Sequence, residues 1–276
     1  MLYRWARPTT LKQMAWEFGR QPGHLCECII WMFQHVLYEF PHLEDGRSVE
    51  AWAGHFARFS AAIHDKAGPG TLTNCALLYD VKIQETTKPI HFQADFYTGF
   101  TRCHGLKWLE VAFPNGILPF PFGQVGSNEA DPTVFVRSGL RRSILRASIK
   151  AGRVHCGYGD PAFGQDRFCQ GPYKWLPLSS GEASHNTKMS KVRVPNEWGI
   201  GLVTRHFSAL NFKSNLRIFR SPLYLYWPVL QILTNCHTCF YHNQISNYFK
   251  CKPPSVFEYV EMGRELPAPR RRSRLG

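Results

Sequence analysis

The chain has 276 residues, of which 44% are apolar and 14% aromatic, so it can bury a substantial core as one large domain or two small ones. Its formal charge of +13 favours a polyanionic partner, since the basic residues cluster along the chain. The N-terminus has no signal-peptide core, and the most apolar late run, 223–233, is interrupted by Pro228, which argues against secretion and a membrane span. We therefore expect a soluble, intracellular protein whose nine cysteines are reduced thiols.

Residues 1–70 have the pattern of helices. Leu11, Met14, Ala15 and Phe18 share one helix face, and Gly19 to Pro22 ends that helix before a longer amphipathic stretch up to residue 40. Two helices joined by a short turn are compatible with a helix-turn-helix and equally with a helical hairpin packed on the core. A further helix is expected over 52–67, and residues 68–70, Gly-Pro-Gly, mark a boundary.

The next segment has the pattern of a sheet followed by a helix. Residues 75–80 form a short apolar strand that ends in Asp80, and residues 81–96 are expected to be a loop. Two more apolar runs, 106–113 and 117–122, flank a Pro-Asn-Gly turn, and the prolines in the second run predict an irregular or edge strand. After a polar loop over 123–130, Asp131 before a proline predicts a helix start, where it would at least serve as an N-cap.

The second half of the chain begins with a cluster of basic residues. Arg142, Arg146 and Lys150 are spaced i, i+4, i+8 and form one stripe, either a solvated face or a phosphate-binding one. We expect a strand over 154–158, a loop over 164–184, a helix over 198–210 and one or two buried helices over 222–249. Residues 252–276, with a Pro-Pro pair and three consecutive arginines, have the composition of a basic, disordered tail.

Six blocks, in their order and spacing, resemble the catalytic core of Harbinger-type (PIF/Harbinger) transposases and the nucleases derived from them. They begin with Asp80 and continue with Tyr97-Thr-Gly99, with Arg102 to Lys107 and Pro114 to Gly116, and with Asp131 and Ser138 to Leu140. The later blocks are YGDPAF at 158–163, MSKVRVPNEWGIG at 189–201 and the C-terminal block at 234–249. The match covers most of residues 11–259.

This resemblance implies an α/β, RNase H-like catalytic domain, with a mixed sheet flanked by helices, over residues 71–251. A small all-helical region, 1–70, would precede it, and the tail, 252–276, would follow. The implied activity is metal-dependent cleavage of phosphodiester bonds in double-stranded DNA, with or without strand transfer, in the nucleus. It also implies a separate Myb-like DNA-binding partner.

The family's three carboxylates map onto Asp80, Asp131 and Glu197 as catalytic residues and as ligands of two Mg²⁺ or Mn²⁺ ions. Such ions take oxygen ligands and leave positions open for water and phosphate. The three acids are separated by 51 residues (131 − 80) and by 66 residues (197 − 131), so only the fold can bring them together. The residues expected to contact DNA are Lys107, Arg137, Arg141, Arg142, Arg146, Lys150 and Arg193.

Three departures from the family pattern support an alternative, a DNA-binding or protein-interaction module that kept the fold and lost catalysis. Val81-Lys82 replaces the usual Gly-Thr, Ala130 replaces a His, and Pro195 lies two residues before Glu197, where a helix would have to begin at the proline. Two other sites compete less well. Asp160 is either a turn residue or an alternative ligand, and Cys236 and Cys239 alone are a weak zinc signal. The sequence contains no nucleophile-elbow motif, which argues against a serine hydrolase.

Overall fold

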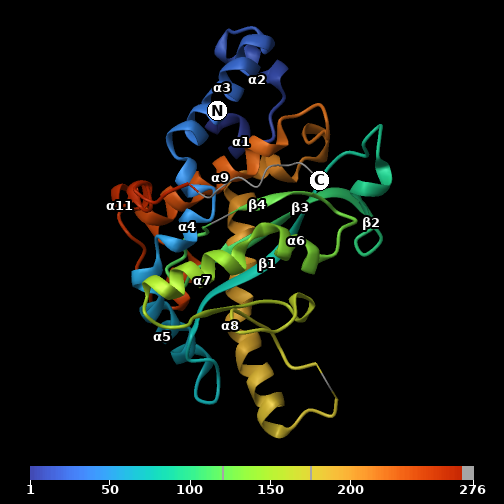
Figure 1. The fold of residues 1–276 in the computed structure, drawn as a ribbon. Helices are drawn as coiled ribbons and strands as arrows, with labels where there is room; N and C mark the ends of the chain where they lie inside the picture. Colours follow the sequence, from blue (N-terminus) through green and yellow to red (C-terminus); the bar gives the residue numbers. More distant parts are fainter. Residues whose placement is uncertain (120, 175, 269–276) are drawn as a thin grey trace.

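The computed structural model describes residues 1–119, 121–174 and 176–268, and every structural statement below concerns those residues. A six-stranded mixed sheet is flanked by helices, and a helical region precedes it in the chain (Figure 1). The strand order is β2-β3-β1-β5-β6, with β4 also paired to β3. This mixed α/β architecture agrees with the RNase H-like fold that the sequence predicted.

The sheet is built around β1, which is paired on both sides. It runs antiparallel to β3 and parallel to β5, and β5 runs parallel to β6. The strands are β1 (Cys75–Glu85), β2 (Tyr97–Thr98), β3 (Cys103–Ala112), β4 (Phe122–Gly126), β5 (Cys156–Tyr158) and β6 (Cys169–Gln170). β1 extends five residues beyond the predicted strand end at Asp80, because pairing with β3 continues to Glu85 opposite Gly105.

The second strand of the predicted pair was placed too early. Of the expected run 117–122, residues 117–119 and 121 are not in a strand, and β4 begins at Phe122. The backbone of Leu118 is instead satisfied by side chains from α9 (Leu223–Tyr241). Asn235 accepts from the Leu118 N–H at 2.9 Å, and Gln231 donates to its carbonyl at 2.9 Å. Because the neighbouring prolines disfavour strand pairing, the buried backbone of this segment is hydrogen-bonded by side chains instead.

The two faces of the sheet carry different helices. Tyr79 on β1 stacks on Phe135 of α6 (Asp131–Ser138), with ring centroids 5.1 Å apart. Glu110 on β3 accepts a hydrogen bond from Trp227 of α9. Since side chains alternate along a strand, α6 and α7 (Leu140–Lys150) cover one face, and α8 (Ser180–His206) and α9 cover the other (Figure 1).

The N-terminal region packs on the end of this assembly. α3 contacts α9, α1 contacts the segment 208–211, and α5 packs on β1 and α8. Buried side chains from all three predicted segments join one hydrophobic core, from Trp5 to Tyr259. The helices here are α1 (Leu2–Ala6), α2 (Leu11–Phe18), α3 (Pro22–Glu39), α4 (Arg47–Glu50) and α5 (Phe56–Ala67), with short 3-10 turns at 41–43 and 53–55.

The C-terminal part contains the expected buried helices, α9 and α10 (Gln244–Tyr248). Within the segment predicted as a tail, α11 (Val256–Glu261) forms because Ser255 and Glu258 make a capping box and Tyr259 is buried. The arginine triplet at 270–272 lies outside the described residues. Among the described residues no helix is long and apolar enough to cross a membrane. All nine cysteines are free thiols.

Candidate active site

Asp80 lies near the middle of β1, directly opposite Glu110 on β3. One of its carboxylate oxygens accepts the Val81 N–H at 2.8 Å, and the other lies 3.6 Å from the Arg193 guanidinium. Burial raises the pKa of Asp80, and the charges of Asp160 and Glu197 raise it further, while the Val81 N–H and Arg193 oppose this effect. Three carboxylates therefore influence one another at this point of the sheet.

Asp160 follows β5, the parallel neighbour of β1. The register pairs Tyr158 with Leu78, and the same register continued by two residues sets Asp160 beside Asp80. The Asp160 carboxylate accepts the Ala162 N–H at 2.8 Å and caps the short turn 161–163. An acid directly after an apolar strand is predicted to be either a turn residue or an alternative metal ligand. The position of Asp160 is compatible with both.

Glu197 reaches the site from α8. Arg193, one helical turn earlier, lies 3.4 Å from Glu197 and also contacts Asp80, so it joins the two acids. Asp80, Asp160 and Glu197 carry a charge of −3 against +1 for Arg193, which leaves −2. The site is open to water on one side, since the Glu197 side chain is 54% exposed.

The helix that carries Glu197 begins much earlier than expected. The sequence predicted a loop over 164–184 and a helix start at or after Pro195, but α8 begins at Ser180 with Ser179 and Glu182 in a capping box. Pro195 lies inside the helix and cannot donate to the Lys191 carbonyl. The Tyr248 hydroxyl lies 3.5 Å from that carbonyl and supplies a substitute donor. The proline is tolerated because a neighbouring helix satisfies the freed oxygen.

Asp131 occupies a different place. It is the first residue of α6, and it pairs with Lys107 at 2.7 Å, while the same ammonium donates to the Glu129 carbonyl. Lys107 stands opposite Ile83, whose side chain lies on the other face of β1 from Asp80. The structure thus brings Asp80 and Glu197 together through Arg193, and it sets Asp131 across the sheet from them.

A model of the DDE superfamily endonucleases matches residues 79–235, which is more than half of the chain. The chain belongs to this family. No match was found among curated proteins or among solved structures. The matched region contains every acid described above, from Asp80 on β1 to Glu197 on α8.

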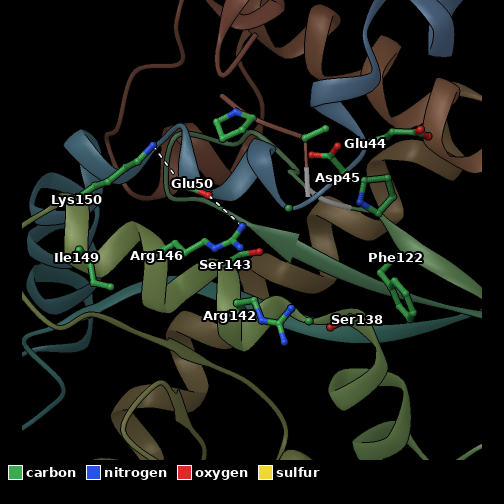
Figure 2. A pocket seen from close by; sticks show the side chains of 15 residues that line it. Glu44, Asp45, Glu50, Phe122, Ser138, Arg142, Ser143, Arg146, Ile149 and Lys150 are labelled. Atoms are coloured by element: carbon green, nitrogen blue, oxygen red, sulfur yellow. Dashed lines mark ion pairs between the residues drawn. The ribbon is translucent and has the colours of Figure 1, made fainter. Parts of the chain in front are cut away.

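In this DDE superfamily endonuclease, most of the predicted DNA-contacting residues are engaged in ion pairs. Lys107 and Arg193 pair with the acids above, Arg137 with Glu129, Arg141 with Asp166, and Arg146 and Lys150 with Glu50. Arg142 has no ion pair within the described chain, and it is one of the residues of α7 and of the segment 44–50 that line a cavity of about 750 Å³ (Figure 2). Arg146 and Lys150 share the single carboxylate of Glu50, so among the described residues Arg142 is the member of the stripe without an ion pair.

The three acids have the donor atoms and the charge that a hard divalent cation requires, but their carboxylates are not grouped closely enough to hold one. Their donors are all oxygens and their formal charge is −3, or −2 with Arg193 included, which suits Mg²⁺ or Mn²⁺. Within the described residues, however, no three Asp, Glu, His or Cys side chains are grouped closely enough to hold a metal. Arg193 pairs with both Asp80, at 3.6 Å, and Glu197, at 3.4 Å. The zinc alternative at Cys236 and Cys239 is not supported, because zinc binds the thiolate and burial favours the protonated thiol. Burial raises the pKa of Cys236 and raises that of Cys239 to about 12.

Proposed function

We propose that this chain is a divalent-metal-dependent DNA endonuclease of the Harbinger transposase type. The observation that carries the proposal is the pairing of Asp80 and Glu197 with one arginine, Arg193, beside the charge of Asp160, inside the region that matches a DDE endonuclease family. The substrate is double-stranded DNA, in keeping with the charge of +13. The resemblance to Harbinger proteins adds a nuclear location and a Myb-like DNA-binding partner to the proposal.

The chain's own residues have distinct parts in this reaction. Asp80 and Glu197, with Asp160 as the third oxygen donor, would hold the metal, which when bound activates an attacking oxygen and stabilises the leaving one. Arg193, released from the two acids, is in place to contact a phosphate of the strand. Asp131, the second acid by family resemblance, would join them only if α6 gave up its contact with Lys107.

The test is plasmid nicking in Mg²⁺ or Mn²⁺ by purified full-length protein. We expect Asp80→Asn and Glu197→Gln to abolish cleavage and to leave DNA affinity intact, since each change keeps the side-chain volume and removes one anionic ligand. Asp160→Asn and Asp131→Asn then decide the third position. Loss in Asp160→Asn alone supports the arrangement seen here, and loss in Asp131→Asn alone supports the family alignment when Asp131→Asn with Lys107→Met is folded and equally inactive while Lys107→Met is active. If the parent cleaves nothing in either metal, the nuclease function is wrong for this chain and the non-catalytic alternative replaces it.

DNA binding itself has a matched pair of variants on α7. Arg142→Ala removes a cation without an ion pair, whereas Arg146→Ala removes one that already faces Glu50. If α7 contacts duplex phosphates, Arg142→Ala should lower the slope of log K against log salt by about 0.9, and Arg146→Ala should lower it less. Equal slopes in parent and Arg142→Ala would remove α7 from the DNA footprint.

A further inference from the structure

Two exposed segments meet beyond the end of β1, far along the chain from each other. The Thr87 N–H donates to the Leu216 carbonyl at 3.0 Å, and Phe92 faces Phe219 with ring centroids 6.1 Å apart. These segments, 86–102 and 212–220, form the projection beside β2 in Figure 1. They are therefore one surface, and neither supplies an acid to the candidate active site.

The turn after β2 belongs to the same surface. Glu85 pairs with Lys213, and a hydrogen bond from Lys213 to Glu85, with a smaller contribution from Cys103, raises the pKa of Lys213. Phe96, directly before β2, also packs against Phe219, with ring centroids 5.7 Å apart, and the turn 99–102, which carries Phe100 and Arg102, joins β2 to β3.

Large aromatic rings stand in solvent on this surface. Phe92 is 68% exposed, Phe100 is 94% exposed and Phe219 is 66% exposed. A single exposed ring is ordinary on a protein surface, but three on adjoining segments indicate a binding function.

The backbone holds these residues in an unfavourable conformation. Phe92, Arg102 and Phe219 have φ angles of 56°, 53° and 66°, the left-handed region that favours glycine. Bulky residues in this region are uncommon, and they cluster where the side chain itself is needed. The sequence keeps phenylalanine and arginine at these turns although glycine would relieve the strain.

The charge of this surface is complementary to phosphate. Lys88, Arg102, Arg217 and Arg220 form no ion pair with any described residue, and Asp95 is the acid that remains once Lys213 and Glu85 cancel. The sum is 4 − 1 = +3. Free cations beside exposed rings are the combination by which proteins hold unpaired nucleotides, with phosphates on the cations and bases on the rings.

A cavity lies beside the Glu85–Lys213 pair of this surface. It has a volume of about 400 Å³ and is lined by Lys82, Glu85, Asn211, Lys213 and Trp227 among others. Lys82 lies on the same face of β1 as Asp80, two residues along. From Asp80 to Glu85 the strand rises roughly 17 Å.

We propose that this aromatic–basic surface, Phe92, Phe100 and Phe219 with Arg102, Arg217 and Arg220, binds unpaired nucleotides of a DNA strand that leads to the acids. The choice of DNA rests on the proposed function, but strand binding requires neither metal nor cleavage. The surface thus gives the protein a preference for DNA with an unpaired segment next to the cleavage site.

The test measures the affinity of the full chain for a fluorescently labelled oligothymidine of 20 residues without divalent metal, and for a duplex of equal length. We expect Phe100→Ala and Phe219→Ala each to weaken single-strand binding about 5- to 150-fold, the range for one stacked base, and to leave duplex binding unchanged. Arg102→Ala should lower the single-strand salt slope by about 0.7. Phe257→Ala on α11, 80% exposed and away from this surface, is the matched control.

Replacement by tryptophan and leucine separates stacking from plain apolar contact. Phe100→Trp should keep the affinity, and its fluorescence should be quenched by the oligonucleotide, whereas Phe100→Leu should bind like the alanine variant. Parental affinity in Phe100→Leu, or in both alanine variants, would overturn the proposal and leave a protein partner as the occupant. If the parent protein cleaves no DNA but its single-strand binding still depends on Phe100 and Phe219, the nuclease function is refuted and this binding surface is upheld.

Discussion

Glu110 makes stability depend on pH in a direction opposite to that of most carboxylates. It is fully buried on β3, one oxygen accepts a hydrogen bond from Trp227, and the other has no partner in the described chain. Burial raises its pKa from 4.5 to about 8, against the opposing effects of Trp227 and Lys82. In the folded protein this carboxyl is therefore neutral at pH 7, and unfolding releases its proton.

The magnitude follows from linkage. Because the folded pKa lies above the unfolded one, the contribution of this group to stability is complete below pH 4.5 and is lost as pH rises to about 8. The difference, 8 − 4.5 = 3.5 in pKa, corresponds to on the order of 5 kcal/mol at about 1.4 kcal/mol per pKa unit. Glu110→Gln keeps the acceptor for Trp227 and cannot ionise, so it should escape this loss.

The assay is urea unfolding of parent and Glu110→Gln at several pH values from 5 to 8. The free energy of unfolding of the variant minus that of the parent should rise by about 4 kcal/mol over these three pH units. Glu39→Gln, at an exposed carboxyl on α3, is the control for the loss of one carboxylate. A difference between Glu110→Gln and parent that stays constant from pH 5 to 8 would refute a buried neutral acid.

Four further substitutions test the packing around the sheet by denaturant unfolding. Asp131→Asn should cost about 2–4 kcal/mol, since it leaves the buried Lys107 ammonium without its anion, and Lys107→Met should cost less; the reverse order would contradict the pairing. Pro195→Ala should stabilise by up to about 3 kcal/mol by restoring the bond to the Lys191 carbonyl, and a loss would show that the helix needs its proline. Asn235→Ala should cost about 2–4 kcal/mol through the unsatisfied backbone of Leu118, and a cost below about 1 kcal/mol would count against that role.

The sequence predicted the elements whose signals are local. An apolar run ending in an acid gave the core of β1, an acid followed by proline gave the start of α6, and apolar runs gave α9 and α10. It failed where tertiary contacts override a local rule. Pro195 suggested a helix start because the substitute donor, Tyr248, is more than 50 residues away in sequence (248 − 195 = 53). The prolines near Leu118 suggested an edge strand, although the partners of that backbone are side chains on α9.

The site shows the same division between local and tertiary information. The resemblance located Asp80 and Glu197, and the structure joins them through Arg193, one helical turn before Glu197. The role of Asp160 depended on a register that no local pattern reveals, since only the parallel pairing of β5 with β1 sets it beside Asp80. A sequence can show that an acid follows a strand, but the neighbour of that strand is a property of the whole sheet.

The separate position of Asp131 changes how its mutants must be interpreted. An inactive Asp131→Asn variant would ordinarily be taken as evidence for a metal ligand, but here the same change strips a buried ammonium of its counter-ion and threatens the fold. Asp131→Asn combined with Lys107→Met removes both charges together, so it should recover much of the stability that Asp131→Asn alone loses. If that stable double variant cleaves DNA, Asp131 serves the fold through Lys107, and the acids that matter are those around Arg193. If it is stable and inert while Lys107→Met is active, the carboxylate is needed for chemistry, and α6 must swing toward Asp80 when the substrate binds.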